Sequence, residues 1–296
     1  MMKGCHSSAA YIRRLIVPSL ISLILMASCS APVPRPTGVA YEYDSAKDML
    51  KKGQFNRALE FSDGAATATP PNEFTERARV LQVAIYSGLL NAYKELADAY
   101  AEGAEKTKNP SFQGDFSRLR HDYLQYGSRA ALGLGEVAHR ITEGEMVSKE
   151  FTLEAPFPSA EGPAEVVQLK HVMEGGWIEP QDQEAAAIDA QRKGIDDALA
   201  GLVGGDRSKA RTALEAGPVK IDGADFAVYL GNQLLQGARL FDWKHMRDPQ
   251  KLRVLCSEAE EAAKAALALL KENPDKNKEK AAKKLQEDIK AVVKRL

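Results

Sequence analysis

Apolar residues recur at steps of three and four along most of the chain, which is the spacing that places them on one face of an α-helix. One such stripe lies between Asn72 and Glu105 and consists of Leu81, Ile85, Leu89, Ala92, Leu96 and Tyr100. After Asn109-Pro110 a second stripe follows, made of Phe116, Leu119, Tyr123, Tyr126, Ala130, Leu134, Val137 and Ile141. The two stripes predict two long amphipathic helices that face a core.

The same spacing returns after residue 180 and predicts a C-terminal helical region over 181–296. Its stripes are Ile188, Ile195, Leu199 and Leu202, then Phe226, Leu230, Leu234, Gly237 and Phe241, then Leu252, Leu255, Ala259, Ala262, Ala266 and Leu269, and finally Leu285, Ile289, Val292 and Leu296. Asp206 and Asp248-Pro249 are residues that begin helices, and Asn273-Pro274 is a pair that ends them. The exposed side of the last helix is rich in lysine, which is typical of a solvated face and, in an anchored protein, also of a lipid-headgroup patch.

The segment 143–180 is the long exception to the helical pattern. Polar and apolar residues alternate from Val147 to Leu153, and prolines and glycines follow, so the sequence predicts a loop with short extended pieces. Val219-Lys220-Ile221 predicts a short strand that pairs with the segment around Trp177. Because long insertions in helical proteins often carry function, Trp177 and Ile178 are candidate contacts for a partner or ligand. The alternative is that these two side chains hold the loop against the core.

Residues from Tyr41 to Pro70 resemble one unit of the tetratricopeptide (TPR) repeat. The resemblance rests on Ala46, Met49, Gly53, Phe55, Ala58, Ala65 and Pro70. It implies a helical hairpin in which small alanines let two helices approach, while Gly53 makes the turn. One repeat cannot bury its own apolar face, so neighbouring helices are required. We therefore expect an all-α fold, a TPR-like array of helical hairpins or an α-solenoid-like bundle. Its N-terminal helical region covers 41–142, and the irregular insertion covers 143–180. Two short strands are compatible with this fold.

The N-terminus has the pattern of an export signal. Its basic residues are Lys3, Arg13 and Arg14. They precede an uncharged apolar run from Leu15 to Met26, which is short for a helix that spans a bilayer. The run leads into Met26-Ala27-Ser28-Cys29, which resembles the lipobox of bacterial lipoproteins. By that resemblance, residues 1–28 are a signal peptide that is removed, and Cys29 is acylated. An ordinary secreted protein and an uncleaved anchor are the alternatives.

The residues that follow Cys29 fit a tether to a membrane. The stretch 29–40 is rich in proline, which forms neither helix interior nor strand ladder, so the sequence predicts an extended spacer. By resemblance to proteobacterial lipoproteins, Ser30 in place of Asp implies delivery to the outer membrane. The protein would then lie on the inner leaflet and face the periplasm.

Composition and charge narrow the classes of function. The 296 residues include 40 Lys and Arg against 41 Asp and Glu, a net charge of −1, which is too balanced for a binder of nucleic acid. With 44% hydrophobic residues the chain can bury a core, so it is not a disordered protein. After removal of residues 1–28 and acylation of Cys29, only Cys256 keeps a thiol, so no intramolecular disulfide can form. Its place in an apolar stripe predicts a small buried side chain.

Motifs that carry catalysis are mostly absent from the sequence. Gly133–Ala138 matches GxGxxA but lies inside a helical stripe, whereas a dinucleotide site needs that motif after a strand. There is no GxSxG and no HExxH motif. Glu136 with His139, and Asp242 with His245, place a carboxylate and an imidazole one helical turn apart, as in the two-metal sites of helical bundles. Solvated surface pairs explain this spacing better, so the sequence predicts no catalytic residue, no metal ligand and no cofactor.

These observations predict an envelope-anchored lipoprotein that is not an enzyme. It would serve as a TPR-like protein–protein interaction or adaptor subunit of a periplasm-facing complex, bound to the membrane through Cys29. One alternative, by resemblance to the TPR-type lipoproteins that accompany periplasmic solute transporters, is a small-molecule-binding lipoprotein. It would need an apolar pocket between helices, roofed by Thr142 to Pro180. A metal site in a helical bundle is the remote alternative.

Overall fold

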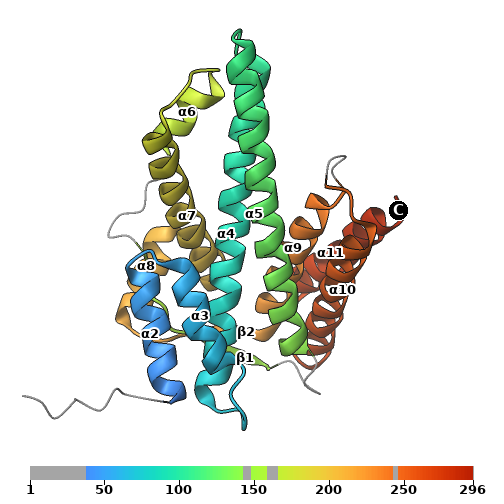
Figure 1. Cartoon of the computed structure of the whole chain (residues 1–296). Coiled ribbons are helices and arrows are strands. Elements are labelled where there is room, and N and C mark those ends of the chain that lie inside the picture. Colours follow the sequence, from blue (N-terminus) through green and yellow to red (C-terminus); the bar gives the residue numbers. More distant parts are fainter. Residues whose placement is uncertain (1–37, 143–147, 159–165, 243–245, 296) are drawn as a thin grey trace, which may run out of the picture. The chain divides into compact units, whose positions relative to one another are not determined.

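The computed structural model of the protein describes residues 38–142, 148–158, 166–242 and 246–295. The predicted signal peptide, Cys29 and most of the predicted tether lie outside these residues. Within the compact unit Val39–Leu296, the described residues form ten helices and two strands (Figure 1). The helices are α2 (Val39–Lys51), α3 (Phe55–Ala66), α4 (Glu73–Lys106), α5 (Pro110–Thr142), α6 (Val167–Met173), α7 (Pro180–Val203), α8 (Arg207–Ala216), α9 (Gly223–Leu240), α10 (Pro249–Glu272) and α11 (Lys276–Val293). The strands are β1 (Glu150–Leu153) and β2 (Val219–Asp222).

The predicted all-α class is confirmed. Helices that are consecutive in the chain pack against each other: α2 with α3, α4 with α5, α9 with α10, and α10 with α11. The long helix α4 runs among them and contacts α2, α3, α5, α6, α7, α9 and β1 (Figure 1). In the part of the chain that the structure describes, no helix combines the length and the apolar character needed to cross a bilayer.

The α2–α3 hairpin agrees with the pattern that resembles a TPR unit. Ala46 and Ala58 are fully buried, so the small side chains do allow the two helices to approach. Gly53 makes the turn with a φ of +73°, a conformation that glycine adopts without strain, and its N–H donates to the carbonyl of Leu50 at 2.9 Å. The predicted hairpin is therefore confirmed. It packs on the long helix α4 rather than on a second short repeat.

Capping side chains set the starts of several helices. At the start of α4, the N–H of Phe74 donates to the side chain of Asn72 at 2.9 Å, and the N–H of Asn72 donates to the hydroxyl of Thr75 at 3.1 Å. Asp206 accepts from an N–H of α8 and Asp248 from an N–H of α10. The predicted starts at Asp206 and Asp248 are confirmed, and α4 begins one residue after the predicted start.

Helices α4 and α7 touch backbone to backbone. A Cβ on Gly194 would lie 2.3 Å from the carbonyl oxygen of Gly88, and a Cβ on Gly88 would lie 2.5 Å from Cα of Ile195. Both distances are shorter than the non-bonded contacts that Cβ atoms make in proteins, so only glycine fits at either position. The prediction for α7 is partly wrong, because Ile188 is 38% exposed. The side of α7 that packs carries small residues, Ala186, Ala190 and Gly194, since a larger side chain would push the helices apart.

An aromatic ladder joins α4 to α5. It consists of Tyr93 and Tyr100 of α4 and Phe116, Tyr123 and Tyr126 of α5, with neighbouring ring centroids 5.5 to 6.4 Å apart. Burial raises the pKa of Tyr123 to about 12, with the neighbouring tyrosines adding to the shift. The predicted stripe of α5 is wrong at Tyr126, which is 45% exposed at the end of the ladder.

The two strands form an antiparallel pair that differs from the predicted one. Phe151 of β1 lies opposite Ile221 of β2, and the N–H of Gly223 extends the ladder to the carbonyl of Lys149 at 2.8 Å. Of the extended piece predicted over Val147 to Leu153, Glu150–Leu153 is present as β1, while Val147 lies outside the described residues, and the strand predicted at Val219 is present as β2. The predicted pairing of the latter with the Trp177 segment is wrong, because the partner strand comes from the other end of the insertion.

The insertion 143–180 also contains a helix that the pattern did not predict. Helix α6 has only seven residues, of which Leu169 and Val172 are buried. Two apolar positions are too few to establish a helical period in a sequence. The description of 143–180 as irregular is therefore corrected at α6.

The last buried feature is Cys256 of α10, whose side chain is only 2% exposed. Burial raises the pKa of its thiol to about 11, so at neutral pH it is a protonated, apolar group. The prediction that Cys256 is a small buried residue is confirmed.

The contact between α4 and α7 can be tested by adding side-chain atoms at Gly194. We expect Gly194→Val to lower the free energy of unfolding by about 1–3 kcal/mol or more, because the new atoms overlap the backbone of α4. Gly114→Ala is the matched control, since nothing lies within 4 Å of a Cβ there, and it should be neutral or stabilising by up to about 1 kcal/mol. Urea denaturation followed by circular dichroism measures both. Equal midpoints for the two variants would contradict the close contact.

Candidate functional site

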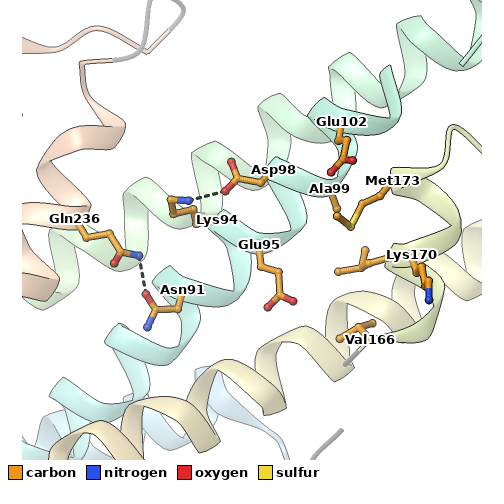
Figure 2. A pocket seen from close by; sticks show the side chains of 11 residues that line it. Asn91, Lys94, Glu95, Asp98, Ala99, Glu102, Val166, Lys170, Met173 and Gln236 are labelled. Atoms are coloured by element: carbon orange, nitrogen blue, oxygen red, sulfur yellow. Dashed lines mark hydrogen bonds and ion pairs between the residues drawn. The ribbon is translucent and has the colours of Figure 1, made fainter. Parts of the chain in front are cut away.

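A groove lies along α4 where α6 packs beside it, and we call it the α4–α6 groove (Figure 2). Its volume is about 550 Å³. The lining from α4 is Asn91, Lys94, Glu95, Asp98, Ala99 and Glu102. The opposite wall is Val166 together with Leu169, Lys170 and Met173 of α6, and Gln236 of α9 completes the lining. One wall of the groove therefore comes from the insertion in which the sequence analysis placed a binding site.

The α4 side of the groove carries a row of three carboxylates: Glu95, Asp98 and Glu102. Steps of three and four residues place them on one face of the helix, next to one another. The opposite face of α4 is occupied by core residues such as Leu96 and Tyr100. The helix thus holds the carboxylate row rigidly, and in Figure 2 the side chains of Glu95 and Glu102 extend from α4 into the groove.

Each carboxylate of the row has a lysine partner. Lys193 Nζ of α7 lies 2.6 Å from Glu95 Oε2, and Lys94 Nζ lies 2.5 Å from Asp98 Oδ2. Glu102 pairs with Lys106 one turn further along α4. Pairs of this exposure contribute only about 0–1 kcal/mol, because water and salt screen them. A basic group of a ligand can therefore replace a lysine at little cost.

The wall that faces the carboxylate row is mainly apolar. Leu169 is almost fully buried, while the side chain of Met173 is 37% exposed at the edge of the groove. Methionine is unbranched and flexible, so it adapts to ligands of different shape. Lys170 adds a cation on this wall, and no ion pair joins it to a carboxylate among the described residues. Toward α9, Gln236 Nε2 donates to Asn91 Oδ1 at 2.7 Å.

The two residues that the sequence analysis selected as contacts lie elsewhere. The ring of Trp177 stacks on Phe112 at 5.2 Å and on Phe116 at 5.8 Å between centroids. Ile178 is only 8% exposed. Neither residue lines the α4–α6 groove. Trp177 holds the connection between α6 and α7 against α5, and Ile178 lies in the core, which fits the structural role considered as the alternative.

The residues of the groove were not selected from the sequence. Asn91, Glu95, Asp98 and Glu102 occupy the polar side of the stripe predicted for α4, and that spacing is visible in the sequence. A polar row of this kind is ordinary on a solvated helix, however, and the facing wall comes from α6, which the pattern did not reveal. The sequence therefore contained a recognisable pattern for the α4 wall of the groove and none for the α6 wall.

The metal hypothesis receives no support from the residues that the structure describes. His139 Nδ1 lies 3.2 Å from Glu258 Oε1 of α10 and so forms a pair across two helices. No group of three or more His, Cys, Asp and Glu side chains that could hold a metal ion occurs in the described ranges. Asp242 is exposed, whereas its predicted partner His245 lies outside the described residues, as does Cys29.

The role of Trp177 can be separated from ligand contact by two substitutions. We expect Trp177→Ala to lower the free energy of unfolding by about 1–3 kcal/mol, because it removes the stack on α5. Trp177→Phe keeps an aromatic ring and should recover most of that loss in a urea titration. A Trp177→Ala protein with unchanged stability would contradict the structural role and return Trp177 to the candidate contacts.

Comparison with known proteins gives no relative for this chain. No family model, no curated protein and no solved structure matches it. Its function has to be inferred from its own residues and their geometry.

Proposed function

We propose that the chain is a lipid-anchored, non-enzymatic adaptor of the bacterial envelope that holds a short segment of a partner protein in the α4–α6 groove. The observation that carries this proposal is the carboxylate row opposite an apolar wall. A segment that fits has an apolar side, which packs on the exposed Met173 of the facing wall, and a basic side, which pairs with the row. This is the way in which amphipathic helices bind in grooves.

The spacing of the row specifies the segment further. Glu95, Asp98 and Glu102 extend over about 10 Å of α4, at 1.5 Å per residue. A helix that lies along α4 would offer Lys or Arg at steps of three and four to reach all three carboxylates. Two to three turns of helix are enough, so we expect a short segment rather than a whole domain.

The N-terminal pattern supports the anchored state. Basic residues, a short apolar run and the lipobox-like end at Cys29 are the features of an acylated protein, and the proline-rich stretch after Cys29 provides a spacer. An acyl chain on Cys29 would keep the groove close to proteins of the same membrane. We propose the outer membrane, with the protein facing the periplasm, on the basis of Ser30.

Binding of a small apolar molecule is the less favoured use of the groove. Seven of its eleven lining residues are charged or carry an amide: Asn91, Lys94, Glu95, Asp98, Glu102, Lys170 and Gln236. Sites for small molecules are mostly apolar with few polar groups. The lining suits a peptide with charges of its own better.

The proposal predicts a crosslink from the groove to one partner segment. A photoreactive amino acid replaces Met173 in the full-length protein in its native envelope, and mass spectrometry identifies the crosslinked peptide. We expect one amphipathic segment with basic residues at steps of three and four. The double reversal Asp98→Lys and Glu102→Lys should reduce its yield about tenfold or more, because like charges then face each other.

The controls use the same chemistry elsewhere on the surface. Glu60→Lys with Glu215→Lys makes the same change in net charge at exposed positions of α3 and α8, outside the groove, and should leave the yield unchanged. Cys29→Ala should lose the crosslink through mislocalisation. If correctly anchored protein gives no crosslink from position 173, or if both double reversals reduce it equally, the adaptor proposal is wrong. A crosslink to a small molecule would favour the accessory of a solute transporter.

A further inference from the structure

The outward side of α11 is a basic surface that the proposed function does not use. We call it the α11 lysine face, and its exposed lysines are Lys276, Lys280, Lys283, Lys284, Lys290 and Lys294. The inward side packs on α9 and α10 through Ala282, Leu285, Ile289 and Val292. Because α11 is held in place by that packing, it presents its lysines as one row about 27 Å long, at 1.5 Å per residue.

Positive charge is concentrated in this segment. Residues 276–295 contain eight Lys and Arg against three Asp and Glu, a net charge of +5. The whole chain has a net charge of −1, so the remaining residues together carry −6. The neighbouring helix α10 has four basic and four acidic residues and is neutral. The separation of charge is thus a property of α11 and not of the whole C-terminal region.

Most lysines of the face form no ion pair within the part of the chain that the structure describes. On the inward side, Lys278 Nζ lies 3.0 Å from Asp222 and 2.8 Å from Asp225, which ties α11 to α9. On the face itself, Lys283 pairs with Glu279. For the other five lysines of the face, the described residues provide no ion pair. In contrast, Lys264 of α10 has both Glu260 and Glu261 within 3.3 Å.

We propose that the α11 lysine face docks on anionic lipid headgroups. The cations of the face are lysines on flexible stems, with the short side chains Ala281 and Ala291 exposed beside them. Such a row fits a flat array of mobile monoanions, each of which can move to meet a lysine. Single-stranded nucleic acid instead needs aromatic side chains on which bases stack, and the face has none. Val293 is the one large apolar residue of α11 that is exposed. We therefore expect α11 to bind the headgroups through charge and not to insert side chains into the bilayer.

This inference is independent of the partner groove. No residue of α11 lines the α4–α6 groove, so either proposal can fail while the other stands. The charge of the face does not depend on an anchor at Cys29.

Lysine footprinting tests the proposal on the full-length protein. The protein is mixed with vesicles of neutral phosphatidylcholine or with vesicles that contain about 30% phosphatidylglycerol. A water-soluble acetylating reagent then labels exposed amines, and mass spectrometry gives a rate for each lysine. We expect the rates at Lys280, Lys284 and Lys290 to fall at least about threefold on anionic vesicles only. The exposed Lys52 and Lys108, far from α11 in the sequence, should not change.

Two further conditions identify the origin of the protection. Salt at about 0.5 M should abolish it, since contacts between exposed charges are screened, and free glycerol phosphate should not produce it. Lys280→Gln with Lys284→Gln should remove the protection of Lys290, whereas the matched control Lys52→Gln with Lys108→Gln should retain it.

The proposal is overturned by either of two results. One is equal labelling of the α11 lysines on neutral and anionic vesicles. The other is protection that appears in native envelope but not on lipid vesicles, which would assign the face to an acidic protein.

Discussion

The rest of the structure depends on the contact between the backbones of α4 and α7 at Gly88 and Gly194. Because no side chain separates the helices there, α7 is fixed along α4, and Lys193, the neighbour of Gly194, reaches Glu95 across the contact. The same contact fixes α6, which precedes α7 by a short connection held on α5 by Trp177. The groove is therefore a consequence of two glycines that lie outside it.

The sequence allowed those parts of the fold to be predicted that depend on neighbours in the chain. Asp206 and Asp248 cap helices through N–H groups three residues away, so these two helix starts could be predicted. Features set by distant residues could not be. The exposure of Ile188 follows from how close α7 comes to α4, and the partner of the strand at Val219 lies about 70 residues earlier. The residues next to Ile188 and Val219 in the chain determine neither the exposure of Ile188 nor the pairing of that strand.

The candidate site was harder to predict than the fold for the same reason. Its walls come from α4 and α6, which are separated by the whole of α5 and β1, and only the α4 wall has a visible period. Trp177 was selected from the sequence because it is a large aromatic residue in the long insertion 143–180. In the structure it supports the connection behind the groove, so its contribution is to position α6 rather than to line the site.

The contact between α4 and α7 is tested most directly by a zero-length crosslink between Glu95 and Lys193. A carbodiimide joins a carboxylate to an amine only when the two are in contact, and here their oxygen and nitrogen lie 2.6 Å apart although 98 positions separate them in the chain. The account predicts a Glu95–Lys193 amide in the folded full-length protein, together with the local Lys94–Asp98 amide, which shows that the reagent has reacted. The local product without the long-range one would contradict the arrangement of α4 and α7, and with it the groove.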